Sequence, residues 1–195
     1  MRFEACLPVI LASEGGYVDD PADPGGATNL GVTRATLSGW LGRPATVAEV
    51  EALTPAHVAP IYRTDYWNPA HAGDCPPGVD LMVFDEAVNQ GVGRALSSLQ
   101  SALGLTSDGA FGRATQAALA AADPGRLIHA IAANREFHYR ALPTFPRFGR
   151  GWLARLHRTT AVAFDMIAPE SQLVSSNAQV EGVRADEPVT QSGPH

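Results

Sequence analysis

The sequence has no long apolar run, few cysteines and no excess of positive charge. No stretch approaches the roughly 20 apolar residues that a helix needs to cross a bilayer, so no integral membrane segment is expected. Cys6 and Cys75 are too few for a disulfide scaffold and stand in no Cys-x-x-Cys pattern, so we expect free, buried or semi-buried thiols. The formal net charge is −6, whereas nucleic-acid-binding domains usually carry a basic face. A nucleic-acid partner is therefore not expected.

Metal ligands and a secretory signal are also missing. The six histidines are scattered and form no ligand set, so we predict no metal and no other cofactor. The apolar run near the start is short, and Glu4 precedes it, which is unlike a signal peptide. We therefore expect a protein that is synthesised in the cytoplasm without a clear signal peptide.

What is present is a soluble, mostly helical pattern. The 195 residues are 45% hydrophobic and 17% charged, which suits one domain, or one domain with an appendage. Apolar spacing and capping residues predict helices over 3–14, 34–41, 55–67, 79–90, 92–103, 112–121, 124–142 and 151–167, and the capping box at Thr46 to Glu49 predicts a further short helix. A small hairpin is expected from Tyr17-Val18 and Leu30-Val32, a loop over 143–150, and a disordered tail over 168–195.

The first expected helix ends on a carboxylate, Glu14, followed by Gly15-Gly16. The negative end of the helix dipole and apolar neighbours would both favour the neutral acid. A glutamic acid that keeps its proton is what a general acid needs to protonate the leaving oxygen of a glycoside. Asp23 and Thr28 follow in a Gly- and Pro-rich stretch that would fold back over the helix end. Two carboxyl groups across a cleft are typical of glycosidases, although Asp-Pro-Gly-Gly is also a common turn sequence.

The whole string is more specific than its parts. Glu14-Gly-Gly-Tyr17, Asp23, Gly25-Gly26, Thr28 and Gly31-Val32-Thr33 resemble the N-terminal motif of glycoside hydrolase family 108, whose members include phage endolysins and secretion-associated muramidases. Val32 stands where that family has Ile. Further matches are Tyr66-Trp67, Asp85 to Gly91, Asp108 to Gly112, and Phe148 to Arg155, so the resemblance covers about residues 3–165.

The resemblance implies a lysozyme-like helical domain with a small β-hairpin after the first helix. Its expected parts are a catalytic region over 3–90, a helical peptidoglycan-binding module over 91–167 packed on it, and the tail. The family's catalytic glutamate falls on Glu14. The spacing to Asp23 and Thr28 is also similar to the Glu/Asp/Thr triad of phage lysozymes, but the last gap is one residue shorter. Asn29 occupies the equivalent offset, so Thr28 and Asn29 are both candidates for substrate binding.

Other residues carry two interpretations each. Asp85 and Asn89 lie four apart on one face of an apolar helix, where they either line the cleft or satisfy buried hydrogen bonds. Asp85 is also the alternative candidate for the second catalytic carboxylate. Tyr17, beside the catalytic loop, is the candidate sugar contact, whereas Tyr62, Tyr66 and Trp67 are more typical of core residues. Between Arg126 and Arg158 there are seven arginines, which either face the carboxylates of muramic acid and stem peptides or form a solvated helix face.

The resemblance implies a peptidoglycan hydrolase that cleaves the β-1,4 bond between N-acetylmuramic acid and N-acetylglucosamine. Glu14 would be the general acid, and Asp23 would stabilise the transition state or position water. Retention and inversion both stay open, because the separation of the carboxyl groups decides between them. The alternatives are a lytic transglycosylase and a non-catalytic cell-wall-binding or secretion-assisting factor. The glycan strand lies in the periplasm or cell wall, so a holin, a secretion system or cell lysis would bring the protein to it.

Overall fold

The computed structural model describes residues 2–19 and 26–167. Asp23 and the tail expected over 168–195 lie outside the described residues. The mostly helical fold with a small hairpin after the first helix is confirmed. The elements follow in the order α1 (Arg2–Glu14), β1 (Thr28–Asn29), β2 (Val32–Thr33), α2 (Arg34–Leu41), α3 (Val47–Glu51), α4 (Pro55–Tyr62), η1 (Arg63–Trp67), η2 (Ala72–Asp74), α5 (Val79–Gln90), α6 (Val92–Ala102), α7 (Arg113–Ala121), α8 (Pro124–Ala141) and α9 (Phe145–Asp165).

The hairpin is smaller than predicted and lies later in the chain. Its antiparallel strands pair Thr28 with Thr33 and Asn29 with Val32, and Leu30 and Gly31 form the turn with φ of 49° and 74°. Positive φ at both central residues is the geometry of a two-residue hairpin turn, and Gly31 adopts it without a Cβ penalty. Val18 joins through a single bridge to Thr28, so the predicted strand at Tyr17-Val18 is reduced to one residue pair.

Local capping explains where several helices begin. Thr33, Thr46 and Thr54 each accept a hydrogen bond from the backbone amide three residues on, at the first turns of α2, α3 and α4. Pro60 lies inside α4 and does not end it, and the chain continues into one π-helical turn over Arg63–Trp67. The predicted helix through Trp67 is therefore present, with a change of winding in its last turn.

The predicted loop over 143–150 is wrong, because α9 begins at Phe145. Pro146 occupies the first turn of this helix, where its missing amide costs no intrahelical hydrogen bond. Gly149 is buried, and a Cβ there would lie 2.4 Å from the ring of Phe145. Pro146 and Gly149, which favour a loop in the sequence, therefore both belong to the helix: the proline lies in its first turn and the glycine allows close packing.

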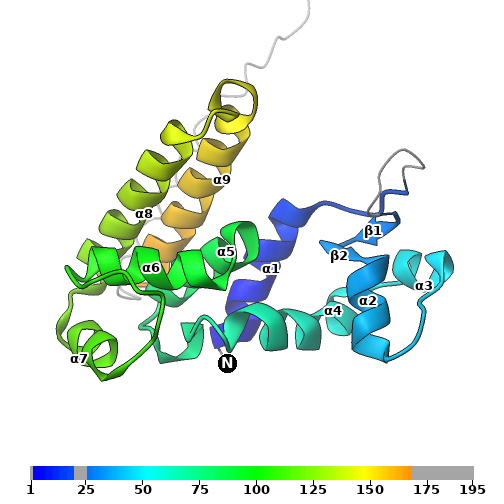
Figure 1. Ribbon diagram of the computed structural model, residues 1–195, viewed down its shortest axis with the longest axis horizontal. Coiled ribbons are helices and arrows are strands. Elements are labelled where there is room, and N and C mark those ends of the chain that lie inside the picture. The colour runs from blue at the N-terminus through cyan, green and yellow to red at the C-terminus, as the bar shows by residue number, and fades with distance from the viewer. Residues whose placement is uncertain (1, 20–25, 168–195) are drawn as a thin grey trace, which may run out of the picture.

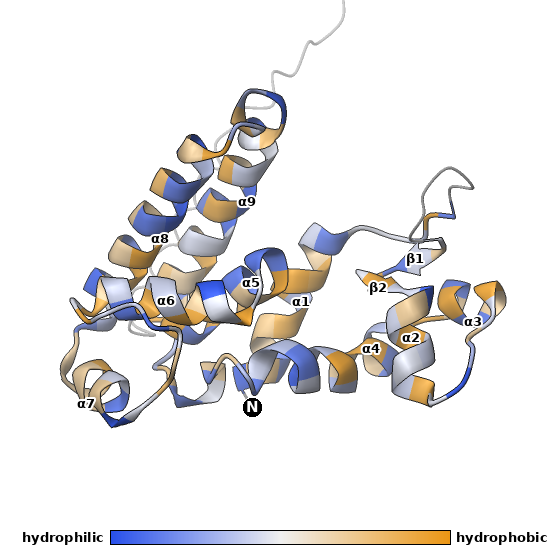
Figure 2. Ribbon diagram, viewed as in Figure 1, coloured by the Kyte–Doolittle hydropathy of each residue, from blue (hydrophilic) through white to orange (hydrophobic). Residues whose placement is uncertain are grey.

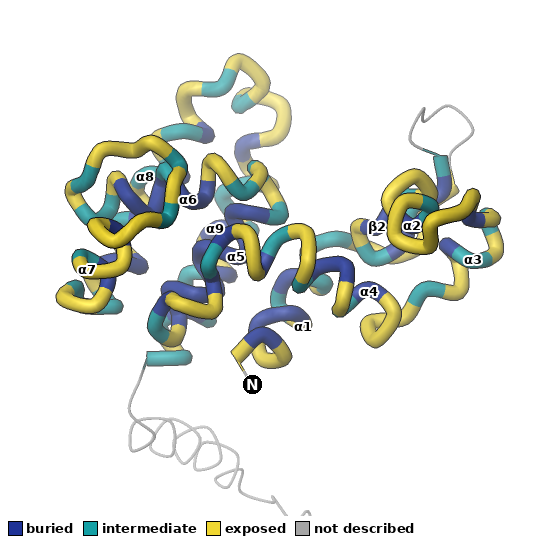
Figure 3. Tube along the Cα trace, turned by 60° about the horizontal axis from the view of Figure 1, so that its bottom comes forward, coloured by how far each residue is buried: buried dark blue, intermediate teal, exposed yellow. Residues whose placement is uncertain are grey.

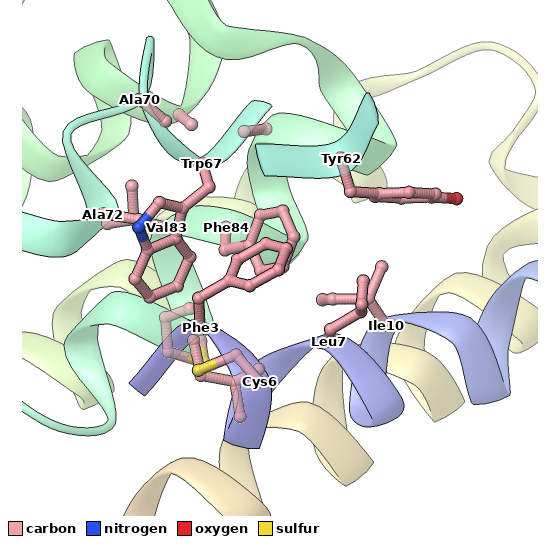
Figure 4. Close-up of a cluster of buried hydrophobic side chains, with 14 of the residues drawn as sticks. Phe3, Cys6, Leu7, Ile10, Tyr62, Trp67, Ala70, Ala72, Val83 and Phe84 are labelled. Carbon is pink, nitrogen blue, oxygen red and sulfur yellow. The ribbon is translucent and has the colours of Figure 1, made fainter. Parts of the chain in front are cut away.

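The core is centred on α5, in which every residue from Val79 to Ala87 is buried; the element lies in the middle of the molecule (Figure 3). On one side an aromatic cluster joins α5 to α1 and η1, with the ring of Phe84 5.7 Å from Phe3 and 5.3 Å from Trp67 (Figure 4). Tyr62 and Trp67 are 2% and 5% exposed, which confirms the interpretation of these two aromatics as core.

Helices α8 and α9 form an antiparallel pair that projects from the body, while β1, β2, α2 and α3 lie at the far end of the molecule (Figure 1). Both helices alternate hydrophilic and hydrophobic residues along their length (Figure 2). That pattern is typical of helices that pack along one face and meet water on the other. The C-terminal end of α1, which carries Glu14, lies between these two parts of the chain.

Candidate active site

Glu14 is the last residue of α1, and its side chain is 19% exposed. Its Oε1 accepts a hydrogen bond of 2.7 Å from Nη1 of Arg155, which comes from α9 and is 11% exposed. A charge-assisted bond of this length fixes the position of the carboxyl group. The predicted acid is therefore held by a cation 141 positions away in the sequence.

Arg155 is in turn held by Asp85 of α5. Its Nε donates to Asp85 Oδ1 at 2.9 Å, and Nη2 lies 2.9 Å from the same oxygen. The other carboxylate oxygen, Oδ2, accepts from Nη2 of Arg135 at 2.7 Å. Asp85 and Arg135 are fully buried. Buried charges persist in folded proteins when they are paired in this way, and here the pairs form a chain from the core to Glu14.

The hairpin turn approaches Glu14 from the opposite direction. A Cβ at Gly31 would lie 3.1 Å from Glu14 Oε2 and 2.3 Å from the hydroxyl of Tyr62. That hydroxyl donates to the backbone carbonyl of Leu30 at 2.9 Å. Burial raises the pKa of the Tyr62 phenol, and the nearby Glu14 carboxylate raises it further. Tyr62 therefore stays a neutral donor that ties the turn to the helix end, and only a glycine fits at position 31.

Beyond Asp85 the polar chain reaches the surface through Tyr139. The Tyr139 hydroxyl accepts from Arg135 at 3.1 Å and from the amide of Gln90 at 3.3 Å. It donates to Oδ1 of Asn89 at 2.9 Å. Asn89 is exposed and Tyr139 is buried, so the chain that begins at Glu14 ends at a second point of contact with solvent.

The residues predicted to bind substrate do not all come together. Tyr17 is 38% exposed and close to the helix end in sequence, and its hydroxyl lies 3.5 Å from Asp19. Thr28 is partly buried, with its hydroxyl donating to the carbonyl of Gly26 at 3.4 Å. Asn29 is buried, and its amide donates to the carbonyls of Val50, Glu51 and Leu53.

Two of those expectations need correction. Asn29 uses its amide donors to fasten the hairpin to the end of α3, so the side chain has a structural position and none of the exposure that a sugar contact needs. Asp85 is fully buried with both oxygens engaged by arginines, so neither substrate nor a catalytic water reaches it. Asp85 positions Arg155 instead, and Asn89 is the member of that pair that reaches solvent.

The sequence-based interpretation missed the two arginines that organise the site. Both lie in the Arg-rich stretch 126–158, whose members were expected to face solvent or the substrate. Arg135 and Arg155 instead point inward to Asp85. A polar Asp85 on an otherwise apolar helix was the signal that could have found them, because a buried carboxylate requires a cation.

Both cysteines are free and buried, as predicted. Burial raises the pKa of the Cys6 and Cys75 thiols to about 12, so both stay protonated and neither can act as a nucleophile near neutral pH. Over residues 2–19 and 26–167, no helix combines the length and the apolar character needed to cross a membrane.

Comparison with known proteins agrees with this arrangement. Residues 7–91 match the family described as Glycosyl hydrolase 108. A search of the curated proteins finds no match. Among solved structures, the chain is similar to that titled "Structure of Brucella abortus SagA", with 41% sequence identity and a TM-score of 0.74 over 87% of this chain and 97% of that one. The chain is therefore a relative of Brucella abortus SagA and belongs to the glycosyl hydrolase 108 family, whose domain spans residues 7–91.

Proposed function

We propose that this protein is a muramidase that hydrolyses the β-1,4 bond between N-acetylmuramic acid and N-acetylglucosamine in peptidoglycan, with Glu14 as the general acid. Membership of a glycosyl hydrolase family supports hydrolysis of glycosidic bonds. The observation that carries the proposal is a partly exposed carboxyl at the end of α1, held from one side by Arg155 and bordered on the other by the Gly31 turn. A catalytic acid needs this combination of access and fixed orientation.

The two oxygens of Glu14 have different surroundings. Oε1 is occupied by Arg155, whereas Oε2 accepts no hydrogen bond from a described residue and faces the hairpin turn. In the proposed reaction Oε2 carries the proton and delivers it to the glycosidic oxygen. Arg155 keeps Oε1 in place, and after proton transfer its guanidinium stabilises the carboxylate that remains.

Asp23 is the proposed second carboxylate, on the spacing of the motif. It would stabilise the positive charge that develops on the sugar, or orient the attacking water. We place the reaction in the periplasm or cell wall, with a holin or a secretion system as the proposed route. The helical region over 91–167 is proposed to bind peptidoglycan in addition to supplying Arg155.

The test is clearing of purified cell walls by Glu14→Gln, which keeps the shape of the side chain and removes the acid. We expect a loss of at least about a hundredfold, the lower range for general acid catalysis. Glu4→Gln is the matched control: it lies on the same helix ten positions earlier, about 15 Å away, with a side chain 52% exposed. Clearing by Glu14→Gln at the rate of the Glu4→Gln control would refute the proposal.

Product mass separates hydrolysis from transglycosylation. A hydrolase adds one water to each cleaved strand, whereas a lytic transglycosylase leaves a 1,6-anhydro end without added water. Mass spectrometry of the released muropeptides should show the hydrated product. If the wild-type protein releases anhydro products and Glu14→Gln releases none, Glu14 is still the catalytic acid, but the protein is a lytic transglycosylase and the muramidase assignment is wrong.

A further inference from the structure

A second site lies beside the ion-pair chain, on the C-terminal part of the molecule. A pocket of about 370 Å³ is lined by Asn89, Gln90, Arg94, His138, Tyr139, Leu142 and Trp152. These residues come from α5, the first turn of α6, α8 with its C-terminal cap, and α9. The pocket therefore lies where the last turn of the segment that matches the hydrolase family meets the helices that follow residue 91.

Its position relative to Glu14 follows from helical geometry. Asn89 is one turn beyond Asp85 on α5, Tyr139 is one turn beyond Arg135 on α8, and Trp152 is one turn before Arg155 on α9. One turn of helix is about 5.4 Å. The pocket is thus displaced by one turn, on three helices at once, from the charges that hold Glu14.

The pocket is electropositive. Arg94 and His138 line it, and no carboxylate does. Burial lowers the pKa of His138, and the neighbouring Arg94 cation lowers it further, so the imidazole is neutral near pH 7 and serves as a hydrogen-bond donor. Arg94 acts through space on the buried Glu86. Among the described residues, however, no carboxylate lies within ion-pair distance of Arg94 or His138. An exposed cation and a donor thus share a concave site that contains no anion.

One wall of the pocket is aromatic. The ring of Trp152 lies 5.4 Å from that of Tyr139 and 5.9 Å from that of Phe148, with interplanar angles of 35° and 31°. Phe148 is 44% exposed. A row of tilted rings next to fixed polar groups suits a ligand with both apolar faces and charged substituents.

We propose that this pocket is a carboxylate-binding subsite, in which Arg94 and His138 hold an acidic substituent of the peptidoglycan strand while Trp152 packs against the sugar or peptide that carries it. The proposal rests on the proposed function, since it assigns a role in substrate binding to a pocket one helical turn from the ion pairs that hold Glu14. The carboxylate comes either from the lactyl group of muramic acid or from the stem peptide. The subsite would make the enzyme prefer acidic strands over neutral chitin-like polymers.

Binding can be measured without catalysis, on the full chain, by NMR of the Trp152 indole N–H, assigned by loss of its signal in Trp152→Phe. The probes are muramyl dipeptide, its neutral carboxamide and N-acetylmuramic acid. If the peptide supplies the carboxylate, muramyl dipeptide should bind about fivefold more tightly than the carboxamide, the factor for one half-exposed ion pair. N-acetylmuramic acid separates the two sources, because only the lactyl carboxylate is free in it. Tight binding of this probe assigns the subsite to the lactyl group, and tight binding of muramyl dipeptide alone assigns it to the peptide.

The double substitution Arg94→Gln, His138→Gln should weaken the acidic probe that wild type binds, so that muramyl dipeptide binds no better than its carboxamide and N-acetylmuramic acid no longer binds tightly. Arg113→Gln is the control, because it removes the same charge from an exposed position on α7 that does not line this pocket. Circular dichroism should give the wild-type melting temperature for both. The subsite would be overturned if wild type bound the two dipeptide probes equally and did not bind N-acetylmuramic acid, or if the double variant bound the acidic probe as tightly as wild type does. Cell-wall clearing by the wild-type protein, measured in parallel, would show that the proposed hydrolase activity holds even if the subsite does not exist.

Discussion

Replacing Asp85 by Asn removes one negative charge from the centre of the ion-pair chain and changes little else in size. In the wild type the two oxygens of Asp85 engage Arg135 and Arg155, and Arg135 is fully buried. Nε and Nη1 of Arg135 already have no hydrogen-bond partner among the described residues. Without the carboxylate, Arg135 becomes a buried cation with no ion-pair partner there.

Removing one partner of a buried ion pair typically costs about 3–5 kcal/mol. For a chain of this length each kcal/mol lowers the melting temperature by about 2–4 °C, so we expect a fall of roughly 6–20 °C. The assay is thermal unfolding followed by circular dichroism, with urea unfolding as a second measure. Cell-wall clearing should also fall at temperatures where the variant is folded, because Arg155 loses the group that orients it toward Glu14.

Asp74→Asn is the matched control, since this carboxylate is 52% exposed and pairs only at the surface with His71. The effect should depend on Arg135: adding Arg135→Met to the Asp85→Asn variant should cost less than Arg135→Met alone. A melting temperature for Asp85→Asn within about 2 °C of the Asp74→Asn control would refute the view that this chain of charges supports both fold and site.

Two further predictions concern the hairpin turn and the buried acid next to Asp85. Gly31→Ala should reduce cell-wall clearing at least about tenfold, because its Cβ would meet the Tyr62 hydroxyl and Glu14; Gly42→Ala, also at positive φ but with open space around it, should show only about 1–2 kcal/mol of backbone strain and normal activity. Similar activities for the two variants would contradict this. Burial raises the pKa of Glu86 from 4.5 to about 7, so its contribution to stability is present at low pH and is lost as pH rises through about 7. The free energy of unfolding of Glu86→Gln, relative to that of wild type, should therefore rise by about 2–3 kcal/mol between pH 5 and pH 8. A difference in unfolding free energy that does not vary with pH would contradict this.

The elements that the sequence predicted well are those with local causes. Threonine caps at positions 33, 46 and 54 act within four residues, so the starts of α2, α3 and α4 could be found from the sequence. The start of α9 was missed because Pro146 and Gly149 are loop signals in most settings, and only packing against Phe145 shows their role in a helix. The hairpin was placed too early because its strands are two residues long.

The site residues that could be predicted from the sequence are likewise those with local causes. Glu14 could be identified because a contiguous motif surrounds it. The chain from Glu14 to Arg135 could not, because its contacts join residues 50 to 141 positions apart and leave no periodic pattern. The pairing of Asp85 with Asn89 on one helix face was visible, but the sequence did not say whether that face met water or arginine. In the structure Asp85 lies in the core and Asn89 lies at the surface.

The hydrogen bond between Glu14 and Arg155 also sets the order in which the site can form during synthesis and folding of the chain. The first helix leaves the ribosome early, but the guanidinium that holds its last carboxyl is encoded more than three-quarters of the way along the sequence. Until α9 has been made and has docked, the side chain at position 14 lacks the contact that orients it. A chain that stops before that point carries the whole motif but lacks the Arg155 contact, so the position of Glu14 is fixed only after most of the chain has been synthesised.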